Sequence, residues 1–252
     1  MHRNQLIRSM ASQHIQQTHR VYPAGGGDYI FPFIGKINFF HEFLFHAIIV
    51  AIMSSYEAFD GLNELQDFLL DFREIERITP IPEGNGEHEN DAEHSYFLAM
   101  AGWYVSEKLH LPLSQEKILK YALVHDLPET YAGDVDAFAS AEERANKAVR
   151  EADAVEKIKA RFGGKFPGML ETLQDYETQE DEESRFVKAL DKLMPPIMIA
   201  IDEGKSWQEH GITQNRLIEN KLQSTSISEP VSQICDALIE YLCQHPEYFA
   251  AE

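Results

Sequence analysis

Cysteine is scarce in this sequence: Cys235 and Cys243 are the two that occur in 252 residues. If both lie on one helix, their separation puts them ~12 Å apart along its axis, too far for a disulfide. The spacing also matches no zinc site, so neither a disulfide framework nor a cysteine-bound metal is expected. Unpaired cysteines that pack as small apolar side chains are typical of a reducing cytoplasm, and we therefore expect a cytoplasmic protein.

Positive charge is also scarce. The chain has 22 Lys and Arg residues against 42 Asp and Glu, a formal net charge of -20, and no run of basic residues. Tight binding to a nucleic-acid backbone depends on clustered Lys and Arg, so we expect no nucleic-acid partner. A small phosphorylated substrate remains compatible with this charge, because a metal ion and one or two local cations can hold it.

Long apolar runs are absent except in residues 37–53, where polar residues such as Glu42 interrupt the stretch. A membrane span needs ~20 apolar residues, so this length is marginal. Residues 1–52 are open to three interpretations: a weak membrane or export element, an extra packed helix, or a segment outside the functional protein. We favour the last. We expect residues 1–52 to be a dispensable extension or an overextended start, residues 53–252 to form the functional domain, and no stable membrane association.

Strand-like alternation, internal repeats and a glycine-rich phosphate loop are missing from the remainder. Apolar residues instead recur at spacings of three and four, which predicts amphipathic helices. The helices that we expect after the first one cover about residues 92–109, 114–125, 140–161, 169–176, 181–201, 206–222 and 231–244. The sequence thus predicts an all-α, single-domain body from about residue 55.

Two of these helices have an apolar face that the sequence defines in detail. The helix that begins near residue 55 is predicted to bury one stripe made of Phe59, Leu62, Leu65, Leu69 and Phe72. The helix over 92–109 is predicted to bury Phe97, Leu98, Ala101, Tyr104 and Val105. Prolines 195 and 196 are expected to kink or end the helix over 181–201, because proline cannot donate the helical hydrogen bond.

Two imidazoles and two carboxylates stand at helix positions from which they can converge. His94 lies near the start of one predicted helix and His125-Asp126 at the end of the next. Antiparallel packing through a short loop brings such ends together. Asp191 lies within a largely apolar helix, where a carboxylate is costly to bury unless it is paired or bound to metal. Taken singly, His94 is more often a hydrogen-bonded, half-buried histidine than a metal ligand. Asp191 alone is most often a solvated charge on a helix face, and Asp126 alone could be a helix-end cap.

The segments around these residues carry a resemblance to a known family. They are Ala92-Glu93-His94-Ser95, Ala122 to Glu129, Ala132-Gly133-Asp134, Tyr176-Glu177-Thr178 and Phe186 to Lys192. Together they resemble the HD-domain superfamily of metal-dependent phosphohydrolases, and most closely the HD-domain 5'-deoxynucleotidases. The resemblance runs from about residue 58 to 205. It implies a helical bundle with a metal site between helices.

The resemblance implies a role for seven residues. The ligands of the divalent metal (Mn, Co, Ni, Fe, Mg or Zn) would be His94, His125, Asp126 and Asp191. Glu129 would be the general acid or base, and Asp134 would lie against the sugar and disfavour a 2'-hydroxyl. Arg77 would grip the phosphate, although Ile78 follows it where the family usually has Trp; Arg73 is the alternative.

These roles predict a phosphomonoesterase that hydrolyses deoxynucleoside 5'-monophosphates to deoxynucleoside and phosphate. One alternative keeps the metal and changes the substrate to another small phosphate ester or a diphosphate. The other alternative is a catalytically silent HD module that binds nucleotides. The expected partner is a small-molecule nucleotide substrate, and the resemblance also makes a homodimer plausible.

Overall fold

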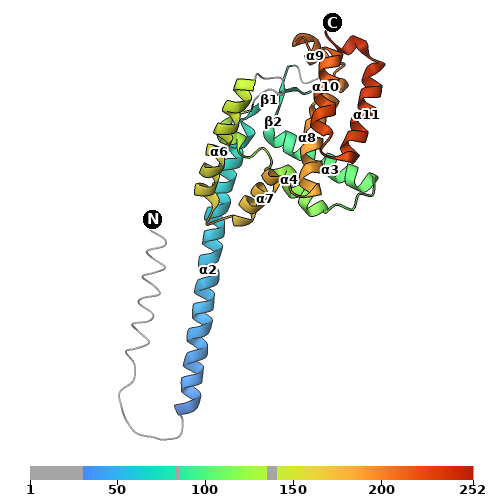
Figure 1. Cartoon of the computed structure of the whole chain (residues 1–252). Helices are drawn as coiled ribbons and strands as arrows, with labels where there is room; N and C mark the ends of the chain where they lie inside the picture. The colour runs from blue at the N-terminus through green and yellow to red at the C-terminus, as the bar shows by residue number, and fades with distance from the viewer. Residues whose placement is uncertain (1–30, 83–85, 135–140, 252) are drawn as a thin grey trace. The chain divides into compact units, whose positions relative to one another are not determined.

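The structure is a computed structural model that describes residues 31–82, 86–134 and 141–251 (Figure 1). The chain divides into two compact units, Met1–Ala58 and Phe59–Glu252. Helix α2 (Phe31–Arg73) begins in the first unit and ends in the second. Among the described residues, no helix is both long and apolar enough to cross a membrane. Residues 1–30 lie outside the described residues, so the proposal that residues 1–52 are an extension stays a prediction.

Helices make up nearly all of the second unit, as the sequence predicts. After α2 come α3 (Asp91–Lys108), α4 (Gln115–Val124), α5 (Glu129–Ala132), α6 (Ala141–Phe162), α7 (Pro167–Thr178), α8 (Glu182–Ile201), α9 (Lys205–Glu209), α10 (Gln214–Thr225), α11 (Glu229–Cys243) and the 3-10 helix Pro246–Tyr248. The prediction of an all-α fold is confirmed.

A small antiparallel sheet is the part of the fold that sequence periodicity misses. Strand β1 (Glu76–Pro80) pairs with β2 (His88–Asn90), with an irregularity in the register between the two ends of β1. Strands this short carry too few residues for a detectable alternation. The sheet sets the site's geometry, because β2 leads directly into α3 and β1 carries Arg77.

Helix α8 is the centre of the main core. It packs against α3, α4, α10 and α11, and it lies between them in Figure 1. The core around it includes Leu98, Ile118, Phe186, Leu190 and Leu193, all nearly inaccessible to solvent. α3 and α4 approach closely at Gly102, where an added Cβ would lie 2.7 Å from Cγ2 of Ile118.

The predicted apolar faces of two helices are confirmed only in part. On α2, Phe72 is buried with α6 and α7 residues, as is Phe68, which lies outside the predicted stripe, whereas Phe59 and Leu62 are more than half exposed. On α3, Leu98 is buried as predicted, but Tyr104 is 66% exposed, and Ala99 and Gly102 complete the buried face. In both helices, apolar side chains occur on more than one face, so spacing alone does not define which face meets the core.

The prolines of α8 do not end the helix. α8 continues to Ile201, as predicted for residues 181–201, although Pro195 and Pro196 cannot donate to the carbonyls of Asp191 and Lys192. The helix expected over 206–222 is two helices, α9 and α10. Gly211 separates them with a positive φ of 64°, a conformation that glycine adopts at little cost.

Candidate metal centre and active site

The four predicted metal ligands come from two helices and from the end of a third. His94 lies in the first turn of α3, whose start is fixed by a capping box between Asn90 and Glu93. His125 is the residue that ends α4, and Asp126 follows it. Asp191 lies in the middle of α8. The packing of α8 against α3 and α4 brings these positions together.

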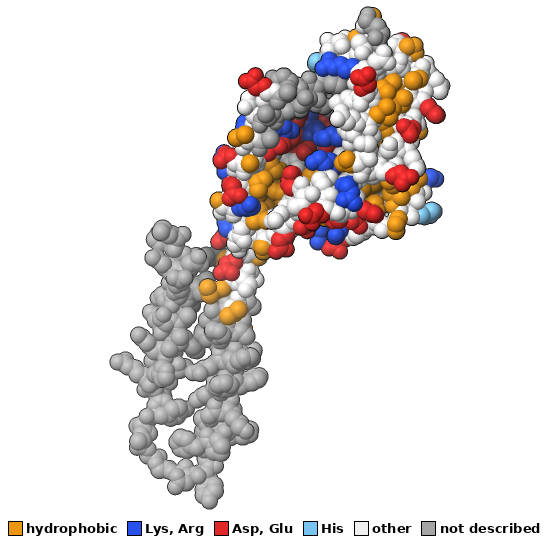
Figure 2. Space-filling view, viewed as in Figure 1, with side chains coloured by type: hydrophobic (Ala, Val, Ile, Leu, Met, Phe, Trp, Pro, Cys, Tyr) orange, Lys and Arg blue, Asp and Glu red, His pale blue; other side chains and the backbone are white. Residues whose placement is uncertain are grey.

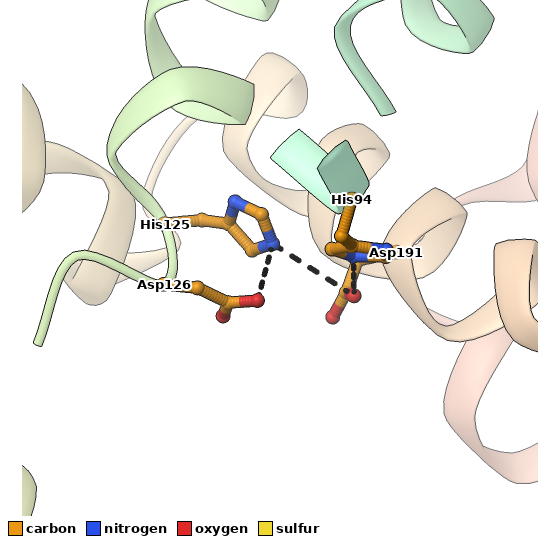
Figure 3. A group of neighbouring side chains, drawn as sticks. All are labelled: His94, His125, Asp126 and Asp191. Carbon is orange, nitrogen blue, oxygen red and sulfur yellow. Dashed lines mark hydrogen bonds and ion pairs between the residues drawn. The ribbon is translucent and has the colours of Figure 1, made fainter. Parts of the chain in front are cut away.

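The ligand atoms of these four residues lie within 4.8 Å of one another (Figure 3). Nε2 of His94 is 2.9 Å from Oδ1 of Asp191. Nε2 of His125 is 2.9 Å from Oδ2 of Asp126 and 3.9 Å from Oδ1 of Asp191. Two imidazole nitrogens and two carboxylates converging at such distances form a donor set that suits a divalent transition metal.

The orientation of both imidazole rings is fixed by contacts of their Nδ1 atoms, which lie on the side away from the other predicted ligands. Nδ1 of His125 is 2.9 Å from the carbonyl oxygen of Ala122, an acceptor that requires Nδ1 to carry the proton. Nδ1 of His94 is 3.2 Å from Oε2 of the buried Glu89. Both contacts leave Nε2 facing the other ligands, which is how metal-binding histidines are held in proteins.

The environment of His125 tests whether the site fits a metal ion. Its Nε2 is buried and has no hydrogen-bond partner, while Oδ2 of Asp126 lies beside it at 2.9 Å. With the proton on Nδ1, both atoms offer lone pairs to the same space. A bound cation satisfies both, so the residues fit a divalent metal.

Arg77 reaches the site from β1. Its Nη1 lies 2.8 Å from Oδ2 of Asp126 and 3.0 Å from Oδ1 of Asp91, and only 11% of the side chain is exposed. Arg73, the alternative, is 63% exposed and pairs with Glu74 instead. The structure therefore brings Arg77, and not Arg73, to the predicted ligands.

Glu129 is buried at the start of α5, just after Pro128. Its Oε1 accepts a hydrogen bond of 2.7 Å from Nζ of Lys147 on α6, while its Oε2 has no hydrogen-bond partner. Burial, and after it the charge of Asp126, raises the pKa of Glu129 to about 9. A carboxyl group with such a pKa can hold a proton at neutral pH and release it.

Asp134 lies just after α5, with Oδ1 3.8 Å from Nζ of Lys147. The same lysine therefore faces both the predicted acid–base residue and the residue predicted to face the sugar.

Four residues of the site escaped the sequence analysis: Glu89, Asp91, Lys147 and Lys192. Burial, and after it the charge of Asp126, raises the pKa of Asp91 to about 6. Nζ of Lys192 is 2.6 Å from Oδ2 of Asp191, and its place next to that aspartate was the available signal. The sequence carries no such signal for Lys147, because α6 is rich in charged residues, and charged residues on a helix are expected to face solvent.

A second set of carboxylates lies beside the first. One oxygen each from Asp91, Asp126 and Glu129 lies within 4.8 Å of the others. The Arg77 guanidinium already contacts two of these three acids, so a cation is present there within the protein itself.

A cavity of about 410 Å³ opens next to these groups. On the side of the predicted ligands its lining includes Arg77, Asp126, Glu129, Asp134, Lys147, Asp191 and Lys192. Figure 2 shows a hollow in which Lys or Arg and Asp or Glu side chains gather. The volume lies within the range of small-molecule pockets, which is roughly 300–1,000 Å³. Among the described residues, His94 and His125 are not part of this lining, whereas Asp126 and Asp191 are.

Comparisons with known proteins agree with this arrangement. The family model described as "HD domain" matches residues 71–234. A protein from Danio rerio named 5'-deoxynucleotidase HDDC2 is 33% identical over 106 residues, which are 42% of this chain and 51% of that protein. The human protein of the same name is 30% identical over 105 residues, or 41% and 50% of the two chains. The chain thus matches about half the length of these curated relatives.

Two solved structures resemble the fold. One, from Magnetospirillum magnetotacticum and described as a predicted metal-dependent phosphohydrolase, has a TM-score of 0.63 at 25% identity. It is matched over 75% of this chain and 96% of its own. A conserved hypothetical protein from Pyrococcus furiosus has a TM-score of 0.50 at 26% identity, over 71% and 98% of the two chains.

Proposed function

Because this chain belongs to the HD domain family, with a match over residues 71–234, we propose that it is a metal-dependent phosphohydrolase. Its substrates are deoxynucleoside 5'-monophosphates, which it hydrolyses to deoxynucleoside and phosphate. The observation that carries the proposal is the buried Nε2 of His125, which has no hydrogen-bond partner and lies 2.9 Å from Oδ2 of Asp126, beside a cavity that Glu129 also lines. The names of the curated relatives support the choice of substrate.

His94, His125, Asp126 and Asp191 would hold the metal. A bound divalent ion neutralises phosphate oxygens and lowers the pKa of a water ligand from about 15.7 toward ~7. The protein's own part is to keep both Nε2 atoms facing inward, through the carbonyl of Ala122 and the carboxylate of Glu89.

Hydrolysis adds water across the bond between phosphorus and the 5' oxygen. The attacking water loses a proton, and the 5' oxygen gains one as it leaves. Glu129 is placed to move this proton, because it lines the cavity and its Oε2 has no other partner. Lys147 keeps the carboxyl group in place through the bond to Oε1.

Arg77 and Asp134 would select the substrate. Arg77 lines the cavity, so its guanidinium can donate to a phosphate oxygen. Its buried Nε makes no hydrogen bond, although Oε2 of Glu89 lies 3.6 Å from it. Asp134 lies on the same cavity. A carboxylate facing C2' would reject a ribose through crowding and through the loss of hydration.

One observation favours a second candidate function, the hydrolysis of another small phosphate ester. Ile78 lines the cavity next to Arg77, at the position where the 5'-deoxynucleotidases usually have Trp. The loss of a large aromatic side chain at this place changes the shape offered to a nucleoside. A cytoplasmic location and a homodimer remain expectations from the sequence and its resemblance.

Phosphate release from a panel of substrates tests the proposal. The full chain is stripped of metal and reloaded separately with Mn, Co, Ni, Mg and Zn. It is then given 5'-dNMPs, 5'-NMPs, 3'-nucleotides and a simple sugar phosphate. We expect metal-dependent release that is fastest with 5'-dNMPs. Turnover of the sugar phosphate alone would support the second candidate, and nucleotide binding without turnover by any metal form would indicate a silent module.

A further inference from the structure

The cavity extends well beyond the predicted metal ligands. Its lining on α8 runs from Asp191 through Pro195 and Pro196 to Ile199. These positions recur on one face of the helix, and the eight residue steps from first to last span ~12 Å. A phosphate held near Asp191 therefore leaves most of this wall to the group that is esterified to it.

One face of α10 lines the same cavity. Leu217, Asn220, Lys221 and Ser224 follow one another at helical spacings of three, one and three. α10 packs against α8, and a helix that only packs in this way presents apolar side chains on its buried face. Three of these four side chains are polar, and Lys221 is 5% exposed. Because these polar side chains line the cavity, they can hydrogen-bond to a molecule bound there.

The rest of this part of the cavity is largely apolar. Pro195, Pro196, Ile199 and Trp207 contribute to its lining, together with the polar Ser206 and His210. Trp207 is 2% exposed, and its ring stacks on Phe249 with centroids 4.9 Å apart and planes at 6°. Apolar walls with a few fixed polar groups are typical of small-molecule sites.

We propose that the α10 face formed by Asn220, Lys221 and Ser224 is the subsite for the nucleobase, and that it selects bases with an oxygen at the position where cytosine and adenine carry an amino group. The proposal rests on the proposed function, since it concerns the leaving group of the same reaction. A lysine ammonium group is only a donor of hydrogen bonds. Uracil, thymine and guanine offer it an oxygen acceptor where cytosine and adenine carry an amino group.

The test compares dUMP with dCMP, which are matched in size, and adds 2-deoxyribose 5-phosphate, which has no base. In the wild-type full chain we expect kcat/KM for dUMP to exceed that for dCMP by about tenfold or more. Lys221→Met should bring this ratio close to one, mainly through a higher KM for dUMP. It should leave hydrolysis of deoxyribose 5-phosphate within about twofold of wild type. Gln223→Ala, on the exposed side of α10, is the matched control and should change nothing.

Calorimetric binding of deoxyuridine gives a readout that needs no turnover. It should weaken by about tenfold in Lys221→Met, and Asn220→Ala provides a second variant if Lys221→Met fails to fold. Equal effects of Lys221→Met on all three substrates, or unchanged deoxyuridine binding, would overturn the subsite. Failure of the proposed function can be distinguished from failure of the subsite. If the proposed function is wrong, the wild type does not turn over these substrates, but the effect of Lys221→Met on deoxyuridine binding still tests the α10 subsite.

Discussion

Nζ of Lys147 on α6 lies 2.7 Å from Oε1 of Glu129 on α5, with Oδ1 of Asp134 3.8 Å from the same nitrogen. Residues 135–140, which join the two helices, lie outside the described residues. The hydrogen bond joins the predicted acid–base residue to a lysine 18 positions later in the chain. Because this bond holds the carboxyl group of Glu129 in place, Lys147 is a positioning residue for Glu129.

Substitution of Glu129 should separate metal binding from turnover. We expect Glu129→Gln to keep metal and to lower kcat by about 10²–10⁴-fold, the usual contribution of general acid–base catalysis. Lys147→Met should lower kcat by less than Glu129→Gln, because its effect on proton transfer passes through the position of Glu129. Lys147 also lines the cavity beside Asp134, so a change in KM would report that second contact. Metal content by mass spectrometry and steady-state phosphate release measure both effects. Loss of metal from Glu129→Gln would show that Glu129 is a ligand instead.

Substitution of Asp134 should change the sugar preference. Asp134→Ala removes a carboxylate from the cavity lining, so ribonucleotides should gain in kcat/KM relative to deoxyribonucleotides by about tenfold or more. The measurement is the ratio of kcat/KM for dUMP and UMP in variant and wild type. An unchanged ratio would remove Asp134 from the sugar site.

Asp181 joins the two helices that carry His125 and Asp191. It caps α8 through the backbone N–H of Ser184, and its Oδ2 accepts hydrogen bonds from Lys117 and Tyr121 of α4 at 2.8 and 2.6 Å. Asp181→Ala should lower the free energy of unfolding by about 1–3 kcal/mol. Asp153→Asn, in an exposed pair on α6, is the control and should change it by no more than a few tenths.

The stabilisation by Asp181 should also depend on pH. Partial burial opposes its ionisation, but the hydrogen bonds from Lys117, Tyr121 and Ser184 outweigh this and hold the pKa of Asp181 well below its usual range. A lowered folded-state pKa gives stability that is complete above the unfolded pKa, about 3.9, and is lost as pH falls toward the folded value. Urea unfolding should therefore show a difference between wild type and Asp181→Ala that is largest near pH 6 and shrinks below pH 4. A difference that grows in acid would contradict this assignment.

Gly102 permits the close approach of α3 and α4. Alanine usually stabilises a helix relative to glycine by about 0.5–1 kcal/mol. At this position the new Cβ would lie 2.7 Å from Cγ2 of the buried Ile118, so Gly102→Ala should destabilise by about 1–3 kcal/mol. Gly61→Ala on α2, where a Cβ meets nothing within 4 Å, is the control with the opposite expected sign. Urea unfolding of both variants measures the change in the free energy of unfolding. A stabilising Gly102→Ala would show that α3 and α4 can move apart without cost.

The helices were largely predictable, because their caps and breakers are local. Ser114 caps α4 by accepting from the N–H of Lys117, as the sequence indicates. The orientation of a helix is not local: Phe59 and Phe68 are equally apolar, and only the packing with α6 and α7 decides that Phe68 is buried. The split between α9 and α10 depends on one positive φ at Gly211, which no hydrophobic period reports.

The candidate site likewise has residues that the sequence predicts and residues that it does not. The four predicted metal ligands could be chosen from short motifs, and the fold brings their ligand atoms together. Lys147 and the face of α10 could not be chosen, since their roles depend on which side of a charged helix meets the cavity. Asp91 and Glu89 precede His94 closely, but their burial follows from a sheet too short to detect.

The most direct test of the central claim compares wild type with Asp126→Ala in the full chain, stripped of metal and reloaded with Mn. Bound metal and phosphate release from dUMP are measured on the same samples, with circular dichroism to establish that the variant is folded. The account predicts that the wild type binds metal and releases phosphate only when loaded, and that folded Asp126→Ala does neither. Phosphate release by stripped wild type, or by Asp126→Ala at the wild-type rate, would contradict a metal-dependent reaction at this site.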